Sequence, residues 1–254
     1  MVGLIRAEFR KLSTTQVWFW MLLLCVGLTI LGVVGSIAGQ ETDLDLAQHV
    51  RDVMISASAA FTYVPLFVLG VLAVTTEYRY QTITPTVLTT PSRWALITAK
   101  LIAYAVVGAV FAVICLAVQL AMALPWLSAR HVHTSIGDQK GPLLITFAVL
   151  ALFALVGLGA GALLRNQIVA VTVGVIFILV LARLFLLIPA VKYIYPYLPT
   201  GAVDSISTDP HDHENRVINH VHLISPGAGI AVLAAWGLLL AILGAGITMN
   251  RDIS

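Results

Sequence analysis

The sequence predicts an all-α integral membrane protein with six transmembrane helices. Of its 254 residues, 59% are hydrophobic and only 10% are charged, whereas soluble domains carry about a quarter charged residues. Six charge-poor runs are long enough to cross a bilayer, since a helix needs roughly 20 residues to span about 30 Å of hydrocarbon. Backbone groups find no water in lipid, so these runs must be helical.

The predicted spans cover residues 17–38, 53–76, 101–124, 143–164, 167–188 and 229–249. We expect Pro125 to end the third span and Pro189 the fifth, because proline removes a backbone donor and clashes with the preceding turn. Arg183 lies near the end of the fifth span, and we expect it to reach outward to the membrane surface rather than line a polar pathway. The whole chain, residues 1–254, is thus predicted to form one transmembrane domain.

The distribution of Lys and Arg predicts that both termini are cytoplasmic. In this orientation the cytoplasmic segments hold Arg6, Arg10, Lys11, Arg79, Arg93, Lys100, Arg165 and Arg251. The outer segments, which are longer, hold Arg51, Arg130, Lys140, Arg183, Lys192 and Arg216. Residues 77–100 then form the longest cytoplasmic loop, and residues 189–227 form an outer cap.

The N-terminal residues predict a short amphipathic interface helix on the inner leaflet. Ile5, Phe9 and Leu12 recur at the spacing of one helical face, with Arg6 and Arg10 beside them. The alternative is a plain basic anchor that orients the first span.

The sequence contains no motif for catalysis or nucleotide binding. It lacks the patterns G-x-x-x-x-G-K-[ST], H-E-x-x-H and G-x-S-x-G. The glycines of "GLGAGALLRN" lie in an apolar run without a preceding strand, so they predict close helix packing rather than a dinucleotide loop. The spans also lack the chain of ionisable residues typical of a proton-driven pump. We expect no enzymatic activity, no cofactor and no nucleic-acid partner for this chain.

All seven histidines fall in predicted outer segments. His211 with His213, and His220 with His222, form H-x-H pairs, which on an extended strand place both rings on one face. Together with nearby carboxylates they could suit zinc or copper. The interpretation we favour is a solvated polar loop whose histidines titrate with external pH.

The predicted outer cap is apolar but rich in proline. Its stretch "LFLLIPAVKYIYPYLPTGAV" is too broken to cross the membrane, and its tyrosines suit the headgroup region. We expect short helices that dip into the outer leaflet, with Tyr195, Tyr197 and Pro199 at a gate.

The cytoplasmic stretch "TTEYRYQTITPTVLTTPSRW" interrupts the apolar runs with a polar patch. Glu77 lies at the end of the second span, where the helix dipole disfavours an anion, so Arg79, Arg93 or a partner's cation is expected to compensate it. Thr84 and Pro85 can begin a short helix that ends before Pro91.

That short helix would carry Val87 and Leu88 on the cytoplasmic side. Exposed apolar residues framed by threonine and arginine are typical of a docking surface for a soluble partner. The alternative is a plain connecting loop.

The same stretch resembles the loop between the second and third spans in permease subunits of type-2 ABC exporters. The family pattern has a Glu, a Thr-Ile or Thr-Leu pair, a later Leu, Pro-x-Arg and a Lys. The matching residues here are Glu77, Thr82, Ile83, Leu88, Pro91, Arg93 and Lys100. The segments "LIRAEFRKL", "GLGAGALLRN", "YPYLP" and "MNRDIS" are also similar to the family, whereas the histidine-rich segment is not part of its pattern.

The resemblance implies a coupling helix seated in a cleft of a separate ATP-binding cassette ATPase, which would hold ATP and Mg. The residues it implies for this contact are Glu77, Thr82, Ile83, Val87, Leu88, Pro91 and Arg93. It also implies pairing with a second permease copy or paralogue in the inner membrane of a bacterium. The expected cargo is a hydrophobic or amphipathic drug, antibiotic, lipid or peptide. A sensor or immunity subunit with the same fold, or a metal-dependent membrane enzyme using the outer histidines, is the alternative.

Overall fold

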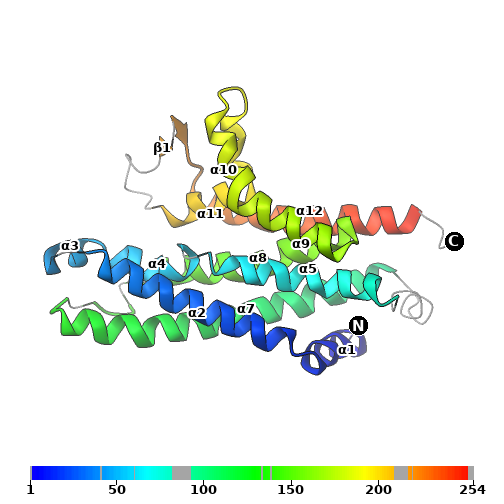
Figure 1. The fold of residues 1–254 in the computed structure, drawn as a ribbon, viewed down its shortest axis with the longest axis horizontal. Coiled ribbons are helices and arrows are strands. Elements are labelled where there is room, and N and C mark those ends of the chain that lie inside the picture. The colour runs from blue at the N-terminus through cyan, green and yellow to red at the C-terminus, as the bar shows by residue number, and fades with distance from the viewer. Residues whose placement is uncertain are drawn as a thin grey trace.

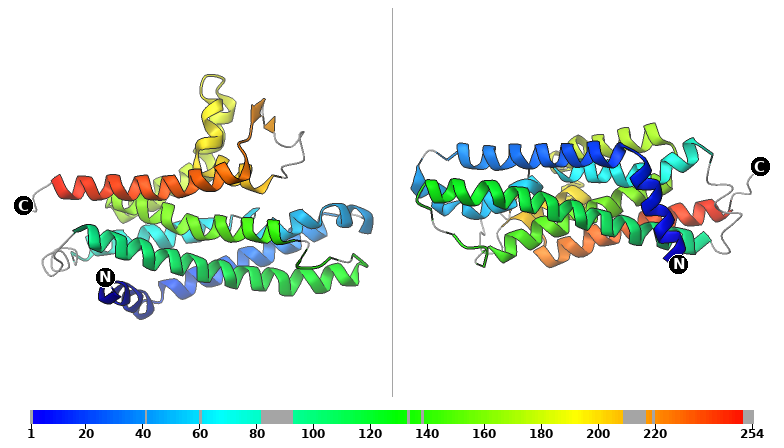
Figure 2. Two further views of the ribbon diagram at one scale, coloured as in Figure 1. Left: turned by 180° about the vertical axis from the view of Figure 1, so that it is seen from behind. Right: turned by 90° about the horizontal axis from the view of Figure 1, so that it is seen from below.

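The computed structural model describes residues 2–40, 42–59, 61–81, 93–132, 134–137, 139–208, 217–218 and 220–250. Most of them form helices that run side by side along one long axis (Figure 1). The first helix, α1 (Val2–Thr14), lies across one end of this bundle (Figure 2). It leads into α2 (Val17–Ala38), which runs the length of the bundle.

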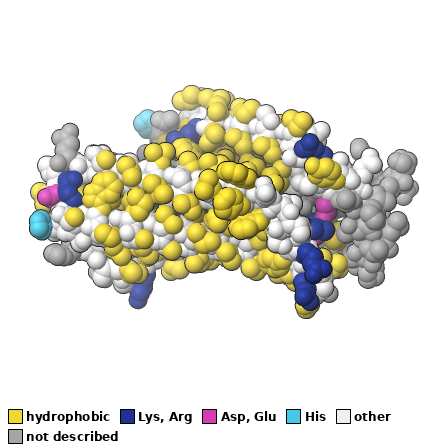
Figure 3. Space-filling view, turned by 60° about the horizontal axis from the view of Figure 1, so that its bottom comes forward, with side chains coloured by type: hydrophobic (Ala, Val, Ile, Leu, Met, Phe, Trp, Pro, Cys, Tyr) yellow, Lys and Arg dark blue, Asp and Glu magenta, His cyan; other side chains and the backbone are white. Residues whose placement is uncertain are grey.

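Five helical stretches in the described part of the chain are long and apolar enough to cross a membrane. They are Val17–Ala38, Ala95–Ala129, Lys140–Leu164, Gln167–Leu187 and Pro226–Gly244. These lie within α2, α7 (Arg93–Ala129), α8 (Lys140–Leu164), the stretch that begins with α9 (Gln167–Ile176), and α12 (Pro226–Asn250). The surface agrees with this architecture, because hydrophobic side chains cover the middle of one face and Lys and Arg lie mainly toward its ends (Figure 3).

The second predicted span, residues 53–76, is not a single helix. It is divided between α4 (Val50–Ala59) and α5 (Tyr63–Arg79), and Phe61 between them has a left-handed backbone with φ of 58°. In a continuous α-helix the carbonyl of Phe61 would accept a bond from residue 65, but Pro65 has no N–H. The carbonyl instead accepts a bond from the amide of Val64 at 2.9 Å. Proline at this position therefore separates the two helices.

The two prolines expected to end helices behave differently. Pro125 does not end the third span, because α7 continues past it to Ala129 and stops only before His131, whose φ is 57°. The prediction of an end at Pro125 is therefore wrong. Pro189 meets the expectation, since the helical stretch ends at Leu187 and Ile188 before the proline is extended.

Close packing around α8 holds the bundle together, as the glycine-rich sequence predicted. A Cβ atom on Gly157 would lie 1.9 Å from the carbonyl oxygen of Phe67 in α5, and one on Gly161 would lie 2.7 Å from that of Val71. On another side of the same helix, a Cβ on Gly159 would lie 2.8 Å from the carbonyl of Gly237 in α12. The absence of side chains at these positions lets α8 approach α5 and α12 closely.

The fifth span changes its helical geometry before it leaves the bundle. After α9 come a π-helical turn (Phe177–Leu181), α10 (Ala182–Leu184) and a 3₁₀ turn (Phe185–Leu187). This part of the chain projects away from the bundle (Figure 1). It is followed by a second 3₁₀ turn (Lys192–Tyr197) and by α11 (Pro199–Ser207), which lies beside the start of α12. Short helices do occupy the expected cap.

Two short elements complete the described part of the fold. The hairpin of β1 (Val217–Ile218) and β2 (Val221–His222) is antiparallel and pairs Val217 with His222. At the same end of the bundle, α3 (Asp43–Gln48) precedes α4. We call this end, formed by α3, the start of α4, α11 and the hairpin, the cap end.

We expect Gly157→Ala to lower the thermal unfolding midpoint of the detergent-solubilised protein. The added methyl group would collide with the backbone of α5, and overpacking of this kind costs about 1–3 kcal/mol. Gly27→Ala in α2 is the matched control, because a Cβ there meets nothing within 4 Å. An unchanged midpoint for Gly157→Ala would contradict the close helix approach.

Candidate functional site

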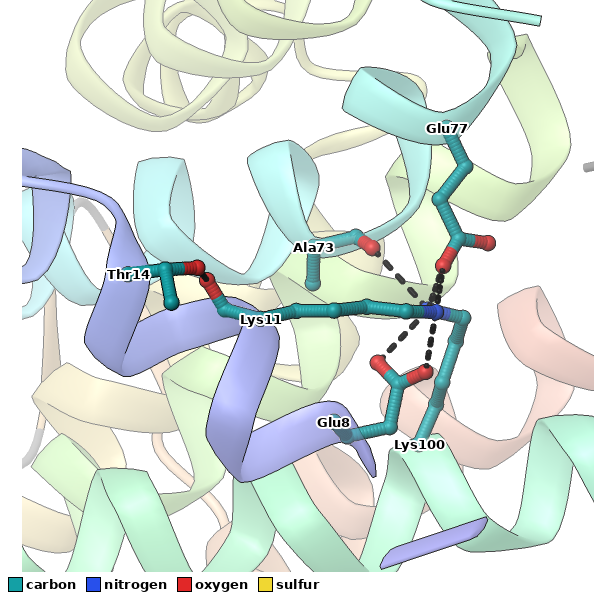
Figure 4. A network of polar contacts seen from close by, with 6 residues as sticks. All are labelled: Glu8, Lys11, Thr14, Ala73, Glu77 and Lys100. Carbon is teal, nitrogen blue, oxygen red and sulfur yellow. Dashed lines mark hydrogen bonds and ion pairs between the residues drawn. The ribbon is translucent and has the colours of Figure 1, made fainter. Parts of the chain in front are cut away.

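Four charged side chains from three helices meet where α1 crosses the end of the bundle (Figure 4). We call Glu8 and Lys11 of α1, Glu77 of α5 and Lys100 of α7 the ion cluster. The Nζ atom of Lys100 lies 2.7 Å from Glu8 Oε2 and 2.7 Å from Glu77 Oε1. The Nζ atom of Lys11 lies 2.9 Å from Glu8 Oε1 and 2.6 Å from Glu77 Oε1. Each lysine therefore bridges both glutamates.

Lys100 also binds the backbone of α5. Its Nζ donates to the carbonyl oxygen of Ala73 at 3.2 Å, in addition to the two carboxylates. An ammonium group has three N–H donors, and all three are used by these contacts. Because the C-terminal end of a helix carries partial negative charge, the lysine compensates both Glu77 and the end of α5.

The ion cluster is largely withdrawn from solvent. The side chains of Glu8, Lys100 and Glu77 are exposed by only 4%, 5% and 8%, whereas that of Lys11 is 46% exposed. Two lysines and two glutamates balance in charge, which makes their burial tolerable. Removal of one partner from a buried pair leaves an uncompensated charge and costs about 3–5 kcal/mol.

The titration of Glu77 and Lys11 reflects these contacts. Burial raises the pKa of Glu77, but the charge and hydrogen bond of Lys100 and the hydrogen bond of Lys11 outweigh it and hold that pKa below its ordinary value. Burial lowers the pKa of Lys11, but hydrogen bonds to Glu77 and Glu8 hold it above its ordinary value. Both groups are thus stabilised in their charged forms.

The cation that compensates Glu77 differs from the one expected. Arg79 donates to Gln167 Oε1 at 3.3 Å and lies over the ring of Tyr80, 5.7 Å from its centroid. Arg93 is the first residue of α7, and its side chain lies outside the described part of the structure. Lys100, which the sequence pattern did include, and Lys11 take the role instead.

Sequence reasoning missed Glu8, although a signal was present. Glu8 falls at the helical spacing of Ile5, Phe9 and Leu12, so it belongs to the apolar face of α1. The three apolar side chains pack against the core, and Glu8 is buried with them. An acidic residue on the buried face of a basic helix indicates a cation opposite it.

The other residues predicted for the interface helix divide by face. Phe9 packs against the core, whereas Arg6 and Arg10 are exposed. Of the predicted coupling residues, Thr82, Ile83, Val87, Leu88 and Pro91 lie outside the described residues. The predicted coupling helix therefore stays a prediction.

The predicted gate residues lie in the cap but have different environments. Tyr195 is buried and its hydroxyl group donates to Asp204 Oδ2. Tyr197 has an exposed ring, and its carbonyl oxygen accepts a bond from Trp236 Nε1 at 2.7 Å. Pro199 is the first residue of α11 and is buried. The Tyr195 contact joins the 3₁₀ turn to α11, and the Trp236 contact joins that turn to α12.

The histidines do not assemble into a metal centre within the described residues. His211 and His213 lie outside that part of the chain. His220 is in the hairpin turn with φ of 63°, and His222 is exposed on β2. No group of three or more potential metal ligands occurs among the described residues.

We expect Lys100→Gln to lower the unfolding midpoint strongly, because Glu8 and Glu77 would then share a buried site with only the half-exposed Lys11. Combining it with Glu77→Gln should recover part of the loss, since the second change removes one uncompensated charge. Thermal unfolding of the three proteins in one detergent checks this, with Arg10→Gln on the exposed face of α1 as the control. A double variant no better than Lys100→Gln would argue against the ion pairing.

The contribution of Glu77 should be lost in acid. Its pKa in the folded protein is lowered from the ordinary 4.5, so its stabilising effect is complete above that value and disappears as the pH falls through the lower folded pKa. The difference in unfolding midpoint between the native protein and Glu77→Gln should therefore be constant at neutral pH and shrink below about pH 4.5. A difference that persists unchanged to pH 3 would refute this assignment.

The comparison with protein families agrees with the sequence resemblance. A family model described as "ABC-2 family transporter protein" matches residues 4–181, which include the whole ion cluster. No curated protein matches the sequence. Because the family match covers well over half of the chain, the protein belongs to the ABC-2 transporter family.

Proposed function

We propose that the chain is the permease subunit of an ABC exporter whose energy comes from a separate ATPase. The observation that carries this proposal is the position of the ion cluster. Glu77 lies in the last turn of α5 and Lys100 near the start of α7, so the cluster joins the two ends of the loop of residues 80–92. Glu8 and Lys11 add α1 to the same joint.

In the proposed mechanism, closure of the ATPase pushes on the loop and on α1. The ion cluster makes these parts move together, since its contacts join α1, α5 and α7. The glycine contacts then carry the displacement from α5 to α8 and from α8 to α12. Closely packed helices shift as bodies rather than deform continuously, so movement at the loop would reach the cap end.

Several features support the partners and the membrane location that we assign to this chain. The sequence has no G-x-x-x-x-G-K-[ST] motif, so we assign ATP and Mg to the ATPase subunit. The density of Lys and Arg favours cytoplasmic termini, and the family resemblance favours the inner membrane of a bacterium. A second permease copy or paralogue would complete the pathway, and a hydrophobic or amphipathic compound would leave through the cap, with Tyr195, Tyr197 and Pro199 at the gate.

Leu88→Asp should abolish transport and association with the ATPase while leaving membrane insertion intact, because a carboxylate would be placed in an apolar docking contact. The measurements are ATP-dependent transport in vesicles and co-purification of the ATPase subunit. Leu44→Asp is the matched control, since Leu44 is an exposed leucine of α3 at the opposite end. The proposal would be contradicted if the Leu88→Asp variant co-purified with the ATPase and supported transport as the native protein does.

A further inference from the structure

A second polar site lies at the cap end, far from the ion cluster. An open cavity of about 590 Å³ is bordered by α4, α10, α11 and the hairpin, and its polar lining includes His49, Arg51, Asp52, Arg183, Asp204 and Ser207. Its volume falls within the roughly 300–1,000 Å³ typical of ligand pockets. Two arginines and two aspartates make the charges of this lining balance.

Two charged side chains of this lining lack an ion-pair partner among the described residues. Arg183 and Asp52 form no ion pair with another described residue, although both line the same cavity. A guanidinium and a carboxylate that both line one cavity and have no ion-pair partner among the described residues point to a ligand that carries both charges.

The other two charged side chains of the cavity, Arg51 and Asp204, are held by hydrogen bonds to neighbouring residues. Arg51 Nη1 donates to the carbonyl oxygen of Ser207 at 2.6 Å, which joins α4 to the end of α11. Asp204 accepts the hydroxyl of Tyr195. Burial raises the pKa of Asp204 above its ordinary value, although the Tyr195 hydroxyl and the charge of Arg183 lower it. A cationic ligand group beside Asp204 would stabilise its charged form.

The cavity borders an apolar surface. Val180, Leu181 and Leu184, the neighbours of Arg183 in sequence, are all exposed large hydrophobic residues on the part of the chain that projects from the bundle. An amphipathic molecule could lay its apolar part on this surface and place its polar end in the cavity. Arginine at such a border is suited to phosphate, which it binds with two parallel hydrogen bonds.

We propose that this cavity binds the zwitterionic phosphoethanolamine headgroup of a membrane phospholipid. The phosphate contacts Arg183, and the ammonium lies between Asp52 and Asp204. A zwitterion leaves the balanced charges of the lining neutral, whereas an anionic lipid would give the occupied cavity a net negative charge. The site does not depend on the proposed coupling to an ATPase.

Native mass spectrometry of the full-length protein, delipidated and supplied with equal amounts of phosphatidylethanolamine and phosphatidylglycerol, tests the site. We expect the protein to retain phosphatidylethanolamine preferentially. Arg183→Gln should weaken that binding about tenfold, the loss typical of a charged hydrogen-bonded contact. Lys192→Gln, which changes a nearby cation that does not line the cavity, should bind as the native protein does.

A further variant separates the headgroup contacts from general lipid adhesion. Asp52→Asn removes a partner of the ammonium and leaves the two arginines, so the preference should shift toward phosphatidylglycerol. Equal retention of both lipids by the native protein, or an unchanged preference in Arg183→Gln, would overturn the proposal. Binding of soluble glycerophosphoethanolamine without binding of the diacyl lipid would show the same headgroup chemistry but overturn the membrane source.

Discussion

The buried ammonium group of Lys100 is the contact on which the arrangement of the bundle end opposite the cap end depends. It binds two carboxylates and a backbone carbonyl from two other helices, and neither carboxylate would tolerate burial without a cation. Through it, the N-terminal helix becomes part of the bundle rather than an appendage on the membrane surface. The attachment includes the helices on both sides of the loop of residues 80–92, α5 and α7.

The ion cluster and the glycine contacts constrain α5 at different positions along its axis. Glu77 fixes the end of α5, and Gly157 and Gly161 of α8 fix its middle by backbone contact. Hydrogen-bonded ion pairs hold the end of α5 in one orientation, because they require a defined geometry. The close backbone contacts leave α5 little room to slide along α8. Together they make α5 and α8 a rigid pair, which suits a part that transmits movement.

Much of the fold could be predicted because the length of an apolar run and the spacing of glycines can be read directly from the sequence. Charge-free runs located the five span-length helices, and closely spaced glycines located the α8 contacts. The break before Pro65 was missed because the run there is free of charged residues throughout, and Pro125 was overinterpreted because a helix can lose one hydrogen bond and continue. At the site, Glu77 and Lys100 were recognisable from the family pattern and Glu8 from its place on the apolar face of α1, but the pairing of Glu8 with Lys100 required the fold, since the two lie 92 positions apart.

The π-helical turn in the fifth span has a consequence for the cap end. Such a turn accommodates one residue more than an α-helical turn, so every side chain beyond it is rotated by about 100° relative to an uninterrupted α-helix. Arg183 comes directly after this turn. A relative of this protein that lacked the extra residue would present a different side chain to the cavity, so the chemistry of the cavity can diverge through a single insertion or deletion, without substitution of any residue in its lining.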